Sequence, residues 1–232
     1  MTSDVRAAPL PQGASAQQSG NVRFALARHG ETVWHSNNRY AGASSDIDLT
    51  PTGRDQAQLL AQWCLGFAPD AVICSPVRRA IETATPSADA AGVALHIIED
   101  LREVDFGLAE GRTIGELTDL DPAMVERFRK DPAAHPFPGA EPPEEAADRA
   151  ALALRDLARQ FSGGKVLVVA HNTLLRVAIC RLLDLPVARY RDIFPRLDNA
   201  AISEMTIAAD PAGISSLHSL NVHLEGGRKP AH

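Results

Sequence analysis

The stretch Phe24-Ala25-Leu26-Ala27-Arg28-His29-Gly30-Glu31-Thr32 joins an apolar run to a polar turn. The apolar part suits a buried β-strand, which we predict over residues 22–28. In open parallel sheets, reactive groups lie just beyond the carboxyl ends of the strands. At that point Arg28 offers a planar fork of donors for an oxyanion, and His29 beside it is a potential nucleophile. Because short motifs also match by chance, this stretch alone leaves a solvated turn at a strand end as an equal alternative.

A second apolar run ends in the same way. Residues 165–170 read Lys-Val-Leu-Val-Val-Ala, and His171 follows directly, before a helix predicted over residues 172–183. A single histidine after a strand is more often structural than functional. Two such strands in a parallel sheet deliver their histidines to the same edge, however. The sequence therefore predicts that His29 and His171 meet in one site.

The rest of the chain alternates strands with helices. Strands are predicted at residues 71–74, 94–98 and 200–207, with a weaker one at 215–220, and helices at 51–65, 76–91, 113–117, 123–129 and 144–161. Two helices carry a start signal, an N-cap residue followed by proline, at Thr50-Pro51 and Ser75-Pro76. This alternation predicts an α/β fold of three layers, with a mostly parallel central sheet and helices on both faces.

Composition narrows the class of protein. With 232 residues, 45% hydrophobic and 22% charged, the chain is long enough for one globular domain, which we predict over residues 22–222. We expect residues 1–21 to form a flexible tail, not a targeting sequence, and residues 223–232 to be frayed. The net charge of −6 argues against a nucleic-acid partner, and no apolar run is long enough to span a membrane.

The cysteines indicate the compartment. Cys64, Cys74 and Cys180 are odd in number and lie in apolar contexts, which suits reduced core thiols of a cytoplasmic protein better than a disulfide framework. Oligomeric state has no signature in the sequence.

Two further features follow predicted strands. Arg79 lies in the first turn of the helix after residues 71–74, where a solvated arginine, as we expect of Arg78, is the alternative. The turn Leu101-Arg102-Glu103-Val104-Asp105-Phe106-Gly107 supplies carboxylates after the third strand. Both features are predicted to lie at the sheet edge that carries the histidines.

Taken together, these pieces resemble the histidine phosphatase superfamily, which includes cofactor-dependent phosphoglycerate mutases and many small phosphatases. The matching pieces run in family order over residues 22–207: Arg28-His29-Gly30-Glu31-Thr32, Asn38-Arg39-Tyr40-Ala41-Gly42, Leu49-Thr50-Pro51-Thr52-Gly53 with Gln56-Ala57, residues 75–84, Glu103, Phe106-Gly107, Glu110-Gly111, Pro138-Gly139 and Val168-Val169-Ala170-His171. Several pieces in the right order leave little room for coincidence.

The resemblance implies a role for each residue. His29 would be the nucleophile and form a phosphohistidine, while Arg28, Arg79 and His171 would surround the transferring phosphoryl group. Glu103 would protonate the leaving oxygen and later activate water. Because arginines neutralise the phosphate, the resemblance implies neither a metal ion nor another cofactor.

Some positions depart from the family pattern. His35 stands where asparagine is frequent, and Asn172 stands where glycine usually follows the second histidine. We keep both as phosphate-binding candidates, since an imidazole can donate a hydrogen bond and asparagine tolerates left-handed backbone angles. Ala109 replaces a frequent tryptophan and Pro142 a frequent serine, which affects the expected specificity and not the reaction.

Three functions remain open. The first is a metal-independent phosphomonoesterase of the histidine acid phosphatase type, acting on a small phosphorylated metabolite. The second is a phosphoglycerate mutase, which the short segment between Glu103 and Pro138 disfavours because the mutases carry a longer insertion there. The third is a catalytically inactive binding or regulatory protein.

Substrate selectivity is expected from residues 112–143. The candidate side chains there are explained equally well by packing or by exposure at the surface: Phe128, Arg129, Lys130, His135 and Phe137.

Overall fold

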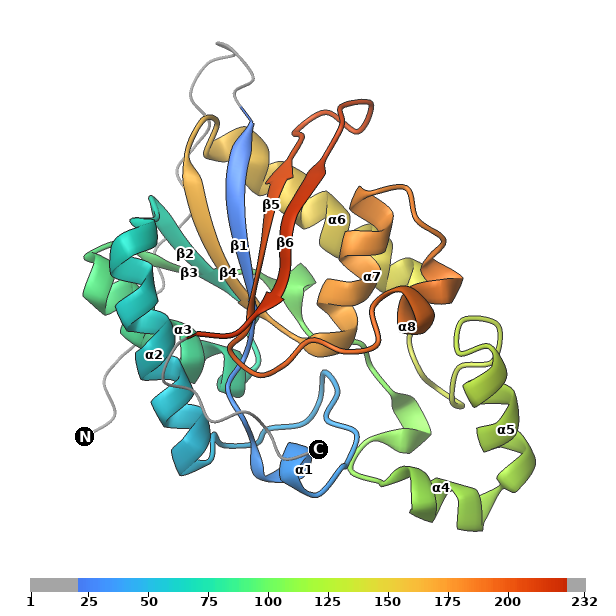
Figure 1. Ribbon diagram of the computed structural model, residues 1–232. Helices are drawn as coiled ribbons and strands as arrows, with labels where there is room; N and C mark the ends of the chain where they lie inside the picture. The colour runs from blue at the N-terminus through green and yellow to red at the C-terminus, as the bar shows by residue number, and fades with distance from the viewer. Residues whose placement is uncertain (1–20, 225–232) are drawn as a thin grey trace.

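The computed structural model describes residues 21–224 and contains one six-stranded sheet (Figure 1). Its strands lie in the order β3 (Leu95–Ile97), β2 (Ala71–Cys74), β4 (Lys165–Ala170), β1 (Val22–Arg28), β5 (Ile202–Ile207) and β6 (Ser216–Val222). The first four strands are mutually parallel. β5 runs antiparallel to β1, and β6 antiparallel to β5. The predicted mostly parallel sheet is therefore confirmed.

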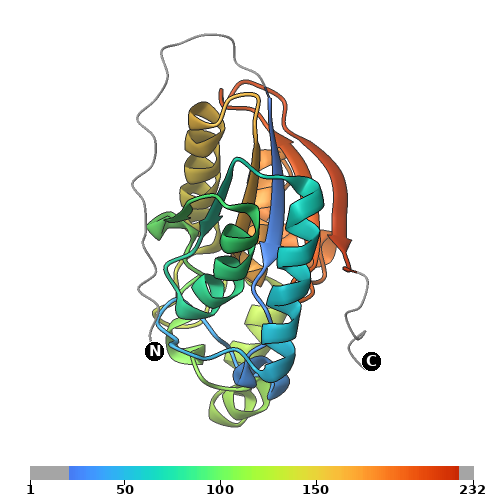
Figure 2. The ribbon, with the colours of Figure 1, turned by 90° about the vertical axis from the view of Figure 1, so that its left-hand side faces the viewer.

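Helices cover both faces of this sheet, as Figure 2 shows from its edge. One face carries α2 (Pro51–Phe67) and α3 (Arg78–Ala91), and the other carries α6 (Pro143–Gln160) and α7 (Asn172–Leu182). Side chains alternate along β1, so that Phe24 and Leu26 pack toward α6 and α7, while the alanines between and after them pack toward α2 and α3. The predicted three-layer architecture is confirmed.

A smaller lobe extends beyond the carboxyl edge of the sheet. It contains α4 (Ile114–Leu120) and α5 (Pro122–Lys130), whose apolar side chains form a separate cluster. Phe128 and Phe137 are buried there with ring centroids 4.1 Å apart, so packing is the observed role of Phe137. Short elements that the sequence did not predict are α1 (Val33–Ser36), α8 (Tyr190–Ile193) and 3-10 turns at Glu99–Leu101, Gly107–Ala109 and Val187–Arg189.

One of the two predicted helix starts is correct. The Thr50 hydroxyl accepts a hydrogen bond from the Gly53 amide, with Pro51 at the first helical position. The prediction for Ser75 is wrong, since α3 begins at Arg78 with Val77 as its N-cap. The Ser75 hydroxyl instead lies 2.6 Å from His171 Nε2, so its side chain serves the sheet edge and not the helix terminus.

Cys64, Cys74 and Cys180 are free and buried, and cytoplasmic location stays a prediction. Among residues 21–224, no helix has the length and apolar character to cross a bilayer. Of the predicted C-terminal tail, His223 pairs with Asp198 and Leu224 packs against the core. The other residues of that tail, and residues 1–20 of the predicted N-terminal tail, lie outside the described part of the chain.

Candidate active site

The site lies where β1 and β4 end side by side. Arg28 pairs with Ala170 in the sheet, and the His29 amide donates to the Ala170 carbonyl at 2.9 Å. This register brings the rings of His29 and His171 to 5.2 Å between centroids. The turn after His29 needs glycine, because a Cβ on Gly30 would lie 2.5 Å from the Gly53 carbonyl oxygen. The sequence predicts both histidines at one sheet edge, and in the structure their rings lie close together.

His29 is held in the tautomer that a nucleophile needs. Its Nδ1 lies 2.7 Å from the Gly30 carbonyl oxygen, which can only accept, so Nδ1 carries the proton. Nε2 is therefore unprotonated, and its lone pair accepts a hydrogen bond from Arg79 Nε at 3.3 Å. Burial, followed by the charge of Arg79, holds the pKa of His29 well below its usual value. The imidazole is neutral at pH 7.

Arg79 is fully buried and fixed by backbone oxygens. Its guanidinium donates to the carbonyls of Ser45, Ala41 and Gly42 at 2.9–3.1 Å. Thr83, one turn further along α3, accepts from the Gly30 amide and donates to the Arg79 carbonyl. Burial lowers the pKa of Arg79, and the nearby Glu103 charge opposes that shift. A fixed cation therefore faces His29 Nε2.

The two ring nitrogens of His171 have different surroundings. Its Nε2 lies 2.6 Å from the Ser75 hydroxyl, which also accepts from the Val77 amide. The hydroxyl proton is thus available for Nε2, which leaves the proton of the neutral ring on Nδ1. His171 Nδ1 is buried and has no hydrogen-bond partner within the described chain. Burial, with Arg79 next, holds the pKa of His171 well below its usual value, so the ring is a neutral donor.

Arg28 and Asn172 are tied to the segment of residues 194–200. Arg28 Nη1 donates to the Leu197 carbonyl at 2.8 Å, while its buried Nε has no partner within residues 21–224. Asn172 Oδ1 accepts from the Leu197 amide at 2.9 Å. Burial lowers the pKa of Arg28 to about 10, so the guanidinium remains charged at pH 7. Arg28 thus keeps donor capacity for an anion, and phosphate binding by Asn172 stays a prediction.

His35 reaches the same site from α1. Its ring centroid lies 5.0 Å from that of His29, and its Nδ1 lies 2.6 Å from the Thr32 hydroxyl. Burial, then the charges of Arg28 and Arg79, lowers the pKa of His35 to about 2. His35 is therefore a neutral group.

Glu103 is a buried carboxyl group held by backbone amides. Its Oε1 accepts from the amides of Val104 and Leu174 at 2.9 Å, and its Oε2 accepts from the Thr173 amide at 3.1 Å. Burial raises the pKa of Glu103, and these backbone hydrogen bonds oppose the rise. Burial thus favours the protonated carboxyl, and the hydrogen bonds favour the carboxylate. A group that first donates and then accepts a proton has to adopt both states.

Two adjacent cavities share Arg28 and His35 in their linings, while His29, Arg79 and His171 belong to neither lining. The inner one, of about 140 Å³, contacts Arg28, His35, Glu103 and Asn172. The outer one, of about 880 Å³, contacts Arg28 and His35 and extends over α5 and α8. Of the selectivity candidates, Phe128 and Arg129 line the outer cavity, whereas the linings of the two cavities do not include Lys130, His135 or Phe137. In the described part of the chain, no group of three His, Cys, Asp or Glu side chains is arranged to hold a metal ion.

Sequence reasoning missed three residues that organise the site. Ser75 orients His171, Thr83 links α3 to the Gly30 turn, and Asn199 donates to the His29 carbonyl at 2.9 Å. The position of Thr83, four residues after Arg79 on one helix face, was a readable signal. Asn199 had none, because its contact spans 170 residues of sequence.

Comparisons with known proteins agree with this geometry. The profile of the histidine phosphatase superfamily (branch 1) matches residues 24–219. The putative phosphoserine phosphatase 2 of Hydrogenobacter thermophilus is 31% identical over 198 residues, covering 85% of this chain and 96% of that protein. A probable phosphoglycerate mutase from an Enterobacter species is 31% identical over 186 residues, covering 80% and 85%.

A solved structure extends the likeness to three dimensions. The native mycobacterial glucosyl-3-phosphoglycerate phosphatase superposes with a TM-score of 0.78 at 26% identity, covering 87% of this chain and 99% of that one. The family profile spans most of the chain. At the sheet edge, His29 accepts a hydrogen bond from Arg79, and its ring lies close to that of His171. The chain therefore belongs to the histidine phosphatase superfamily.

Proposed function

We propose that the chain is a phosphomonoesterase that works through a phosphohistidine on His29. The observation that carries the proposal is the orientation of His29, whose Nδ1 is occupied by the Gly30 carbonyl while Nε2 faces the guanidinium of Arg79. A neutral nucleophile beside fixed cations suits attack on a phosphate dianion, since positioning and electrostatics dominate phosphoryl transfer.

The proposed reaction has two steps. His29 Nε2 attacks phosphorus, the ester P–O bond breaks, and the leaving oxygen takes the proton of the Glu103 carboxyl. Glu103, now a carboxylate, removes a proton from water, which attacks phosphorus. The N–P bond breaks, and inorganic phosphate, neutral His29 and protonated Glu103 result. Arg28, Arg79 and His171, with His35 and Asn172 as further candidates, hold the phosphoryl oxygens during both steps.

Phosphoglycerate mutase activity is the second candidate, since several relatives are named as probable phosphoglycerate mutases. A mutase must keep water from the phosphohistidine until the product is rephosphorylated. Here the outer cavity of about 880 Å³ adjoins the site directly. We therefore expect 3-phosphoglycerate to yield inorganic phosphate and glycerate, detected by phosphate release and NMR. Conversion to 2-phosphoglycerate without phosphate release would instead support the mutase.

We also propose that the reaction needs no metal ion, which can be checked directly. We expect phosphate release to survive prolonged dialysis against EDTA, because Arg28 and Arg79 supply the positive charge that a divalent ion would otherwise provide. Loss of activity that added magnesium restores would contradict this proposal and indicate a different class of phosphatase.

The outer cavity carries uncompensated positive charge. Arg39 and Arg196 line it but pair with Glu116 and Asp198. Arg129 and Arg191 line it too, and neither has a carboxylate at ion-pair distance within residues 21–224. The Arg191 guanidinium lies 5.2 Å from the Phe128 ring centroid and contacts both cavities. We propose that Arg129 and Arg191 bind a second anionic group of the substrate, carried by its leaving group.

Two substrates of nearly equal shape test this proposal. 3-Phosphoglycerate differs from glycerol 3-phosphate by a carboxylate in place of an alcohol carbon. Loss of a charge-assisted hydrogen bond weakens binding by about 10-fold or more. We expect Arg191→Gln to raise KM for 3-phosphoglycerate by about that factor and to leave glycerol 3-phosphate within about twofold.

Arg196→Gln is the matched control, since Arg196 lines the same cavity but is neutralised by Asp198. We expect the control to leave the ratio of KM values for the two substrates unchanged. If Arg191→Gln leaves that ratio unchanged as well, the second anionic group does not bind there. The phosphatase proposal would be unaffected by that outcome.

A further inference from the structure

The segment that carries Glu103 has little regular structure of its own. Residues 102–106 belong to no helix or strand, yet Glu103 is only 4% exposed. Its carboxylate is held by amides at the start of α7, but these contacts do not fix the backbone on which the side chain stands. A proton donor has to lie within hydrogen-bond reach of the leaving oxygen. Besides the packing of the buried Leu101 and Val104 side chains, this segment needs hydrogen bonds to its backbone to stay in place.

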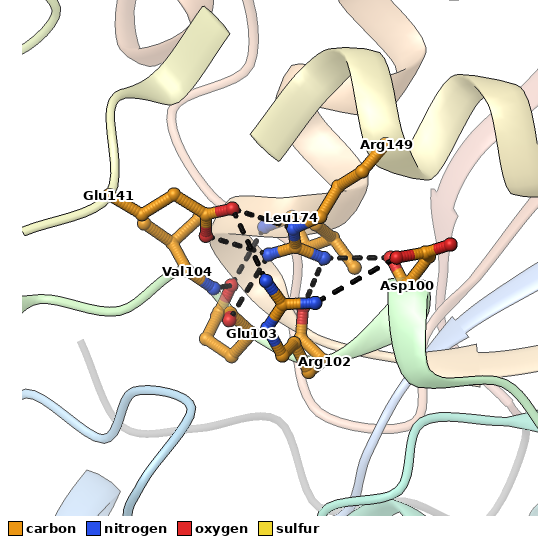
Figure 3. A network of polar contacts seen from close by, with 7 residues as sticks. All are labelled: Asp100, Arg102, Glu103, Val104, Glu141, Arg149 and Leu174. Carbon is orange, nitrogen blue, oxygen red and sulfur yellow. Dashed lines mark hydrogen bonds and ion pairs between the residues drawn. The ribbon is translucent and has the colours of Figure 1, made fainter. Parts of the chain in front are cut away.

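Arg149, on α6, meets that requirement (Figure 3). Its Nη1 donates to the carbonyls of Asp100 and Arg102 at 2.7 and 2.9 Å, and its Nη2 donates to the Glu103 carbonyl at 3.3 Å. Its remaining N–H groups form a bidentate pair with Glu141, at 2.7 Å from Nε and 2.8 Å from Nη2. All five guanidinium donors are thus used, two of them on the segment of residues 102–106 and one on the 3-10 turn that precedes it.

Glu141 completes the arrangement from the other side. Its backbone amide donates to the Asp105 carbonyl at 2.8 Å, so residue 141 contacts the Glu103 segment directly and also orients Arg149. A second cation, Arg102, lies 3.8 Å from Glu141 Oε1 and is the weaker partner. The side chains of Arg149 and Glu141 are only 12% and 14% exposed, so solvent screens this pair little.

We propose that Arg149, oriented by Glu141, is a positioning residue that sets the reach of Glu103 toward the leaving oxygen. All five donors of Arg149 are used within the protein, which leaves none for the substrate, so Arg149 acts through Glu103. The inference rests on the proposed acid role of Glu103. Removing Arg149 should therefore reproduce part of the loss caused by removing the acid, with the same dependence on the leaving group.

Arg155 provides a matched control on the same helix. It is 9% exposed and donates to the carbonyls of Ala208 and Asp210 at 2.8 and 3.0 Å, in the loop that follows β5. Arg155→Met thus removes a buried arginine of α6 that also binds loop carbonyls, but not those of the Glu103 segment. A loss that reflects only damage to α6 should appear in both variants.

The experiment measures the rate of the pre-steady-state burst, which reports phosphorylation of His29, with β-glycerol phosphate and with p-nitrophenyl phosphate. For Arg149→Met we expect a burst about 10-fold slower on the alkyl ester and within about twofold on the nitrophenyl ester, as a partial loss of general acid help predicts. Arg155→Met should change neither burst by more than about twofold. Since Arg149 acts through Glu103, adding Arg149→Met to Glu103→Gln should cause no further loss.

Each result decides between the proposals. Equal slowing of both bursts by Arg149→Met, or the same selectivity in Arg155→Met, would overturn the positioning role. If Glu103→Gln itself shows no dependence on the leaving group, the acid role fails first. Should Arg149→Met not fold, Glu141→Gln tests the same link, because it removes half of the bidentate pair and should show a smaller loss of the same selectivity.

Discussion

Replacing His29 with alanine is expected to abolish turnover while the protein stays folded. Loss of the nucleophile in enzymes that form a covalent intermediate lowers kcat by a factor of about 10⁴–10⁶. The side chain is buried beside the rings of His35 and His171 and is not part of the apolar clusters of the core, so the fold is expected to survive its loss. Wild-type enzyme quenched during turnover should carry phosphate on His29 that is labile in acid and stable in alkali.

The control for this prediction is His96→Ala. His96 is a buried histidine on β3 whose ring centroid lies 6.4 Å from that of Phe161, at the end of α6, so its loss is expected to affect stability and not the chemistry. Melting curves of both variants separate the two effects. Phosphate recovered on a serine or aspartate, or turnover by His29→Ala close to that of the wild type, would refute the phosphohistidine mechanism.

The sheet was predictable because its central strands have a simple signature. Residues 22–28 and 165–170 were predicted as strands, and β1 and β4 have these same bounds. Both strands are buried on two faces, so each is a nearly continuous apolar run, and each ends at a histidine. The edge strand β6 was a weaker prediction, since one of its faces is exposed and its residues alternate in burial.

Short elements and distant contacts could not be predicted in this way. α1 and α8 contain four residues each, which is too short for a helical period to be visible. The segment of residues 194–200 reaches Arg28 and His29 across 169 and 170 residues of sequence. Such contacts follow from the completed fold, and no local pattern encodes them.

The error at Ser75 has the same origin. Serine before proline is a sound helix start when only the local chain is considered. Its hydroxyl instead lies beside His171, which is 96 residues away, because β2 and β4 are neighbours in the sheet. The helix then begins three residues later. Tertiary contact here decided between two uses of one side chain.

Replacing Glu103 with glutamine is expected to cause a loss that depends on the leaving group. An alkoxide is expelled with difficulty unless it receives a proton, whereas a nitrophenolate leaves readily. General acid help is typically worth about 10²–10⁴-fold, or about 3–5 kcal/mol. Phosphorylation of His29 should therefore slow by about that factor on an alkyl phosphate. On p-nitrophenyl phosphate the loss should be much smaller.

The contacts of Glu103 indicate which oxygen carries the proton. Oε1 accepts from two backbone amides and Oε2 from one, at a longer distance, so Oε2 has room for the proton. A glutamine can keep its oxygen at the first position, but its amide nitrogen then faces the Thr173 amide. This contact should cost about 1–3 kcal/mol of stability, which melting curves will register separately from the rate.

Asp105 is the rival acid, two residues further along the chain. Its Oδ1 accepts from the Gly107 amide at 2.7 Å and stabilises the turn there, and Asp105 lines neither cavity. The structure therefore favours Glu103 as the donor. If Asp105→Asn shows the selective loss on the alkyl phosphate and Glu103→Gln does not, the proton comes from Asp105.

The rate of the pre-steady-state burst, and not the steady-state rate, tests this prediction. Glu103 is also expected to activate water in the second step, so total turnover of Glu103→Gln should fall for both substrates. The burst isolates the first step, in which only the leaving group differs between the two esters. Because burial raises the pKa of Glu103, the wild-type burst on the alkyl phosphate should persist to higher pH than an ordinary glutamic acid would allow. That pH dependence should disappear in Glu103→Gln, and equal slowing of both bursts would show that Glu103 is not the acid.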